Sequence, residues 1–70
     1  MGNAYRITEV VGCSPESYAD ATKIAVERAS ATLRDMAWFE VKEQRGMIRG
    51  GKVAEFQVKL QIGSSLETQA

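Results

Sequence analysis

The residue best suited to ligand binding is the only tryptophan, Trp38. It begins an alternating run over residues 38–47 that predicts a β-strand, in which Phe39 and Val41 have the parity of the buried side. Trp38 then belongs to the polar side of the sheet, with Gln57 of a later strand among its possible neighbours, unless a bulge changes the pleating. An indole can stack on a flat ligand, which adds about 0.5–1.5 kcal/mol beyond area burial. A neighbouring amide can both donate to and accept from a heterocycle.

From the residues alone, Trp38 has three interpretations. It could be a core side chain, it could pack between subunits, where tryptophan is enriched, or it could be a stacking platform for a planar ligand. The expected position on a polar face favours the last two. The residues alone therefore predict a planar-ligand site or a subunit interface, and do not choose between them.

The composition argues against several other kinds of chemistry. The chain has no histidine and a single cysteine, Cys13, so one chain cannot assemble Ser-His-Asp or Cys-His machinery, and a structural zinc site is not expected. No intrachain disulfide can form, and the thiol suits a reducing compartment. Nine Lys and Arg balance nine Asp and Glu, which argues against nucleic acid or a membrane surface as a partner. We therefore expect no catalysis and no bound metal.

The length of 70 residues predicts a single domain over residues 1–70. A chain of this size buries only about 60% of the surface its unfolded form exposes, so the monomer is marginal. Without disulfides or a metal, self-association is the remaining source of stability. The N-terminus lacks a signal-peptide pattern, and Arg6 stands where a myristoylation site needs Ser or Thr. No apolar run approaches the roughly 20 residues that a membrane-spanning helix needs. We expect a soluble, cytoplasmic homo-oligomer.

The order of elements is predicted to be β-α-β-β. Residues 5–11 form a β-branched strand, and Ser14-Pro15-Glu16 has the composition of a helix start with Ser14 as N-cap, followed by 3.6-residue periodicity to about Asp35. Residues 38–47 and 53–62 form two strands joined at Gly50-Gly51, a hairpin signal. In the last strand, one face carries Ala54, Phe56, Val58, Leu60 and Ile62. Residues 63–70 are interpreted as a short C-terminal tail.

The sequence resembles the dodecin family at stretches spread over nearly the whole chain. These stretches are Tyr5-Arg6-Ile7, Val11-Gly12-Cys13-Ser14-Pro15, residues 29–33, Trp38-Phe39-Glu40-Val41, Gln44-Arg45-Gly46 and Phe56-Gln57-Val58. The resemblance implies an α+β fold, with an antiparallel three-stranded sheet wrapping one helix, and assembly into a hollow dodecamer. It also implies flavin storage, buffering and photoprotection without turnover.

The same resemblance assigns roles to three residues. Trp38 matches the tryptophan that stacks on flavin pairs at subunit interfaces, and Gln57 matches the glutamine that hydrogen-bonds the isoalloxazine edge. Arg45 matches an arginine near the flavin in bacterial members. The alternative is that Arg45 has no ligand role and simply forms a surface ion pair with Glu43, which would be worth about 0–1 kcal/mol. The implied cofactor is riboflavin or flavin mononucleotide (FMN).

Two departures from the family pattern leave an alternative open. Many bacterial members read Gly-Phe-Arg-Leu-Glu where this chain has Gly63-Ser64-Ser65-Leu66-Glu67. Because serine lacks the paired donors of arginine, we expect weaker selectivity for a phosphorylated flavin and lower flavin affinity. The alternative is a structural or scaffold oligomer with weak or lost flavin binding, which could bind ions or coenzyme A instead. Glu40, Glu43 and Glu55 could then supply oxygen ligands for a cation on symmetry axes. Cys13 replaces the usual Thr or Ser, and we interpret it as a turn substitution without a redox role.

Overall fold

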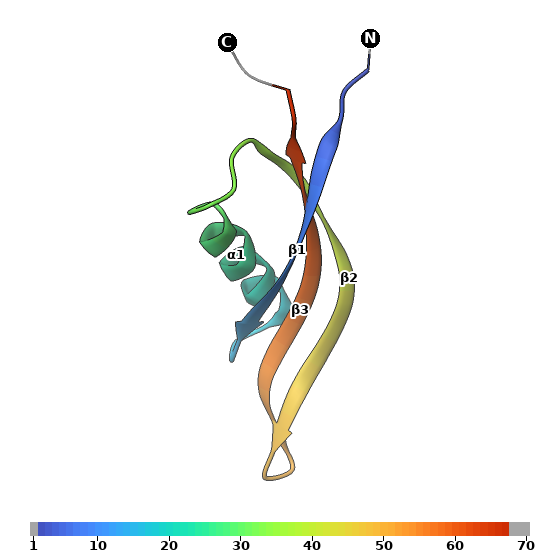
Figure 1. The fold of residues 1–70 in the computed structure, drawn as a ribbon. Coiled ribbons are helices and arrows are strands. Elements are labelled where there is room, and N and C mark those ends of the chain that lie inside the picture. The colour runs from blue at the N-terminus through green and yellow to red at the C-terminus, as the bar shows by residue number, and fades with distance from the viewer. Residues whose placement is uncertain (1, 68–70) are drawn as a thin grey trace.

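The computed structural model describes residues 2–67. Strands β1 (Tyr5–Ser14), β2 (Met36–Arg49) and β3 (Lys52–Ser65) form one sheet in the order β1-β3-β2, with both pairs antiparallel. Helix α1 (Tyr18–Ala29) packs on one face of this sheet, and the β2–β3 hairpin extends well beyond it (Figure 1). The predicted α+β fold and the β-α-β-β order are therefore confirmed. Gly50 and Gly51 form the hairpin turn with φ of 60° and 75°, a region that glycine enters without steric cost.

The start of α1 differs from the prediction. The N-cap is Ser17, whose Oγ accepts the N–H of Asp20 at 2.9 Å. Ser14 instead ends β1, where its Oγ accepts the N–H of Glu16 at 2.9 Å and its hydroxyl donates to the Asp20 carboxylate at 2.6 Å. A residue before proline is held in extended backbone, so Pro15 favours continuation of the strand through Ser14 and begins a turn rather than the helix.

The helix also ends earlier than the predicted limit of about Asp35. It stops at Ala29, and residues 30–35 form a loop that begins with a turn, in which the Ser30 hydroxyl donates to the carbonyl of Glu27 at 2.6 Å. Such side-chain bonds compete with helical ones, and Asp35 has φ of 56°, which no right-handed helix allows. Leu33 and Met36 still pack against the core. The helical period of the sequence therefore continues into the loop after α1, because the apolar residues of this loop pack against the same core as the helix.

All three strands are longer than predicted. The largest differences are at the C-terminal ends of β1 and β3. Gly12 lies beyond the strand predicted over residues 5–11 and Gly63 begins the predicted tail, but both lie inside strands of the structure. A Cβ on Gly12 would collide with the carbonyl of Ala21 and the side chain of Ala25. Glycine at this position lets α1 approach the sheet closely. Residues 68–70 of the predicted tail lie outside the described residues.

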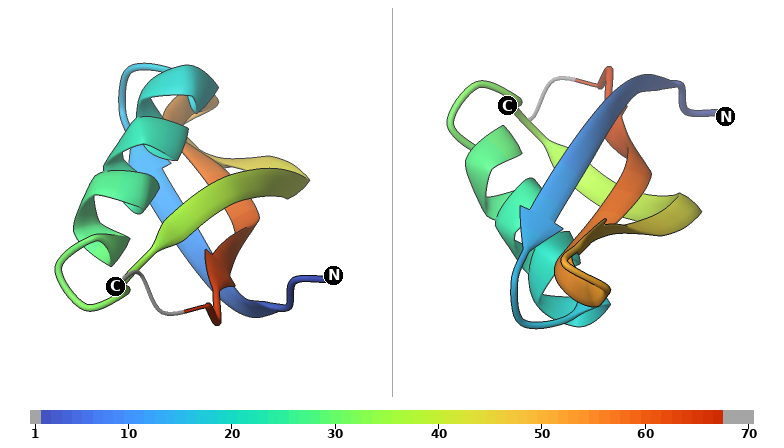
Figure 2. Two further views of the ribbon diagram at one scale, coloured as in Figure 1. Left: turned by 90° about the horizontal axis from the view of Figure 1, so that it is seen from above. Right: turned by 90° about the horizontal axis from the view of Figure 1, so that it is seen from below.

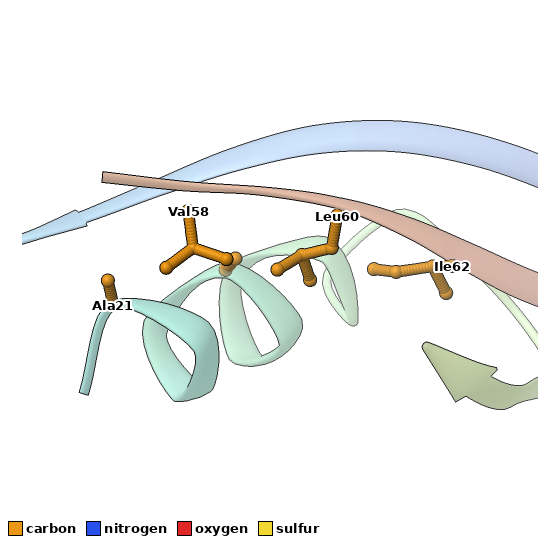
Figure 3. Close-up of a cluster of buried hydrophobic side chains, with 5 residues drawn as sticks. Ala21, Val58, Leu60 and Ile62 are labelled. Carbon is orange, nitrogen blue, oxygen red and sulfur yellow. The ribbon is translucent and has the colours of Figure 1, made fainter. Parts of the chain in front are cut away.

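The core lies between α1 and β3 and is small. It consists of Ala21, Ala25, Val58, Leu60 and Ile62. Figure 3 shows the side chains of Val58, Leu60 and Ile62 on the side of the sheet that faces the helix. The buried face predicted for β3 is thus correct at its centre. Viewed along its length, the subunit has the helix on one side of the twisted sheet only (Figure 2).

Candidate ligand-binding face

Trp38 lies on the face of the sheet opposite α1, here called the outer face. Its partner in β3 is Gly63, which alternates with the buried Ile62, whereas Phe39 pairs with Ile62 on the helix side. Register shifts occur on either side of this segment, between residues 36 and 38 and between residues 41 and 43. The face predicted for Trp38 is nevertheless correct, because the pleating is regular over residues 38–41.

The indole of Trp38 lies against the backbone of β3. A Cβ on Gly63 would fall onto the six-membered ring of the indole, so the ring occupies the space that any other residue would fill at that position. Tyr5 packs beside it, with ring centroids 5.9 Å apart and planes tilted by 58°. The tryptophan side chain is nevertheless 41% exposed. The arrangement holds an aromatic surface in place on the outer face and leaves part of it accessible.

Gln57 and Arg45 form a second group on the same face. They are direct cross-strand partners, and Cys13 is the partner of Gln57 on the β1 side. The Gln57 amide donates to Glu55 at 3.0 Å, and the Arg45 guanidinium donates to Glu43 at 2.7 Å. Arg45 thus makes the ion pair considered from the sequence, and roughly half of each side chain is exposed, 54% for Arg45 and 53% for Glu43. Such pairs contribute little to stability, so Arg45 remains able to turn toward a ligand.

The two groups are far apart within one chain. Gln57 lies six residues before Gly63, the partner of Trp38, and six residues of strand span about 20 Å at 3.3 Å per residue. The expectation that Gln57 neighbours Trp38 is therefore wrong for a single subunit, because strand register was not known. A ligand that contacts both residues must receive them from different copies of the chain.

The three carboxylates considered as cation ligands each have a partner. Glu40 lies 3.9 Å from Lys42, Glu43 pairs with Arg45 and lies 3.7 Å from Lys59, and Glu55 accepts from Gln57. Within residues 2–67, no group of three or more His, Cys, Asp or Glu side chains is placed to hold a metal ion. In the same part of the chain, no helix has the length and apolar character needed to cross a membrane.

Sequence reasoning missed two residues of the outer face, Tyr5 and Gly63. Tyr5 could have been found from its position at the start of a strand, since its alternation places it on the side opposite Arg6. Gly63 could not have been found, because its role follows from the pairing with Trp38 between two distant segments.

The fold and the site together define a class: a small α+β subunit with one helix on one side of its sheet and an accessible aromatic surface on the other. Comparison with known proteins narrows this class. The chain matches the Dodecin family over residues 4–67 and belongs to that family. The dodecin of Thermus thermophilus is 48% identical over 67 residues, which cover 96% of this chain and 97% of the relative.

Solved structures agree with this assignment. The dodecin of Streptomyces davaonensis is 40% identical with a TM-score of 0.90, over 97% of this chain and 100% of that one. The dodecin of Streptomyces coelicolor is 51% identical with a TM-score of 0.88, over 96% of each chain. A more distant structure, 26% identical over 96% of each chain with a TM-score of 0.79, is described as a calcium-chelating calcium dodecin of Mycobacterium tuberculosis.

Proposed function

We propose that this dodecin assembles into a hollow homododecamer and stores flavins, riboflavin or FMN, by stacking them on Trp38 at interfaces between subunits. Gln57 of another copy would hydrogen-bond the edge of the isoalloxazine, and Arg45 would lie beside the ligand. The stacked indole would quench the excited flavin and so limit its photochemistry. The proposed function is binding and protection and includes no catalysis.

The observation that carries this proposal is the position of Trp38. The indole is held against the backbone at Gly63, packed by Tyr5, and still 41% exposed on the outer face. A stacking platform needs this combination, because a fixed ring loses little conformational freedom when a ligand binds. The resemblance to dodecins supports a flavin as the ligand, and the geometry of the ring supports stacking on a planar ligand.

Self-association is supported by the balance of buried and exposed apolar side chains. Between residues 2 and 67 only five hydrophobic residues are buried, two of which are alanines, while Ile48, Val53 and Phe39 are 75%, 61% and 50% exposed. Phe39 also borders an apolar groove with Ala19 and Val26 of α1. Exposed apolar surface on this scale is typical of a protein that buries it against other copies. The distance between Trp38 and Gln57 also supports self-association, because one chain cannot bring both side chains to one isoalloxazine ring.

A fluorescence titration tests the proposal. Riboflavin and FMN are titrated separately with micromolar protein, and we expect their emission to fall as the ligand stacks on Trp38. The variant Trp38→Leu should bind about two- to tenfold more weakly, because loss of stacking worth about 0.5–1.5 kcal/mol corresponds to factors of about two to ten. Glu16→Ala, which truncates an exposed side chain in the turn before α1 that is not part of the proposed flavin site, serves as the control and should quench as the unmodified protein does.

Size-exclusion chromatography with light scattering, run on the same samples, measures the oligomeric state and so distinguishes flavin storage from the alternative of a scaffold oligomer. Full flavin emission in the presence of assembled protein would refute storage and favour a scaffold oligomer. Calcium binding is then the next property to measure, in view of the calcium dodecin relative. A monomeric mass for the unmodified protein would refute the assembly itself.

A further inference from the structure

The side chain of Gln57 is hydrogen-bonded to a carboxylate on the outer face. Gln57 lies in β3, the central strand, between its cross-strand partners Cys13 in β1 and Arg45 in β2. Within residues 2–67, the one hydrogen bond of its side chain is donated by Nε2 to the Glu55 carboxylate, at 3.0 Å. Glu55 comes two residues earlier in the same strand, so the two side chains share a face. Glu55 therefore lies beside Gln57, on the side toward the hairpin.

Glu55 differs from the other glutamates of the sheet. Those at positions 9, 40 and 43 each lie within 3.9 Å of a lysine or an arginine. Among the described residues, Glu55 has no such cation, and its cross-strand partner in β2 is Met47, which offers no strong donor. Glu55 and Gln57 are both partly buried. Because a hydrogen bond to an ionised acceptor is stronger than one between neutral groups, the carboxylate holds the amide firmly.

This bond determines which way round the Gln57 amide lies. A carboxylate can only accept hydrogen bonds, so the amide atom that faces Glu55 must be Nε2 and not Oε1. The two atoms lie on opposite sides of the amide carbon, and Oε1 is therefore turned away from Glu55. Nε2 has a second N–H, which remains free to donate, and Oε1 remains free to accept. Gln57 thus presents a donor and an acceptor in a fixed order along β3.

We infer that Glu55 is a positioning residue for the bound ligand, which it influences by holding the amide of Gln57 in one orientation. The inference rests on the proposed flavin function and deepens it. A flat ring with an N–H beside a carbonyl group complements this amide, because the ring N–H donates to Oε1 and the ring carbonyl accepts from the free N–H of Nε2. The pyrimidine ring of isoalloxazine has such an edge at N3. Since the amide is already ordered, the ligand loses less affinity in fixing it.

A double-mutant cycle on the assembled protein tests this role. Riboflavin is titrated by fluorescence into the unmodified protein, Glu55→Ala, Gln57→Ala and the double variant, and light scattering checks the mass of each. Glu55→Gln, which keeps the volume but no longer forces Nε2 toward it, replaces Glu55→Ala if that variant does not assemble. Glu16→Ala removes the same charge from an exposed turn and is the matched control.

A second ligand separates positioning from a general effect on the subunit. In 3-methylriboflavin a methyl group replaces the hydrogen at N3, so the ring can still stack but cannot donate to Gln57. We expect Glu55→Ala to bind riboflavin about two- to tenfold more weakly, the range for ordering one flexible side chain. Its affinity for 3-methylriboflavin should equal that of the unmodified protein, and in the Gln57→Ala background the loss of Glu55 should have no further effect. Glu16→Ala should bind both ligands as the unmodified protein does.

The inference and the proposed function fail in different ways. Unchanged riboflavin affinity in Glu55→Ala, or losses that multiply in the double variant, would overturn the positioning role while flavin binding stands. An equal loss for riboflavin and 3-methylriboflavin would do the same, because it would assign Glu55 a general structural effect. An unmodified, assembled protein that leaves riboflavin emission unchanged would refute flavin storage, and the role of Glu55 with it.

Discussion

The substitution Gly63→Ala displaces the indole of Trp38 without removing it. The added Cβ would fall on the six-membered ring of the indole, which lies against β3 with Tyr5 beside it. Because an aromatic ring cannot bend away from such a contact, the ring must leave the surface of the strand. Overpacking of this kind costs about 1–3 kcal/mol. For a chain of this size, each kcal/mol corresponds to a melting-temperature change of about 4–8 °C. The comparison is made at one protein concentration, because oligomer stability depends on it.

Intrinsic fluorescence is a direct assay of this displacement, since Trp38 is the only tryptophan. We expect the emission of Gly63→Ala to shift to longer wavelength as the indole becomes more exposed, and flavin quenching to weaken although the tryptophan is present. Gly2→Ala is the control, because a Cβ at Gly2 meets nothing within 4 Å. Unchanged tryptophan emission and unchanged quenching in Gly63→Ala would refute the position of the indole against β3.

Two further substitutions test how α1 is held. Ser17→Ala removes the N-cap bond to Asp20 and should lower the free energy of unfolding by about 1 kcal/mol. Thermal melting followed by circular dichroism measures this loss, and an unchanged melting temperature would contradict Ser17 as the cap. Gly12→Ala places a Cβ against Ala21 and Ala25 and should lower the free energy of unfolding by about 1–3 kcal/mol. A melting temperature equal to that of Gly2→Ala would show instead that α1 can move away from β1 at little cost.

The features that sequence predicted best are local. The alternation through Val58, Leu60 and Ile62 identified the buried face of β3 because a two-residue period is a property of one strand. The face of Trp38 followed in the same way. Gly50 and Gly51 identified the hairpin turn because both residues adopt positive φ, which glycine favours whatever the rest of the fold.

The features that sequence missed depend on competition or on distant pairing. Ser14 and Ser17 can both cap a helix, and only the structure shows that Ser14 remains in the strand. The pairing of Trp38 with Gly63 joins segments 25 residues apart (63 minus 38), which no local pattern reports. The sequence also did not show that Arg6 and Arg34 line a groove with Ser64 and Ser65, because these residues come from three separate segments. The expected effect of the two serines on phosphate selectivity stays a prediction.

The distance of about 20 Å between Trp38 and Gln57 along the sheet has a thermodynamic consequence. In the proposed assembly, a ligand that contacts both residues would act as a cross-link between copies, so ligand affinity and the stability of the oligomer would be reciprocally linked. Ligand binding would then make the oligomer more resistant to dilution and heat, and conditions that weaken the oligomer would release the ligand.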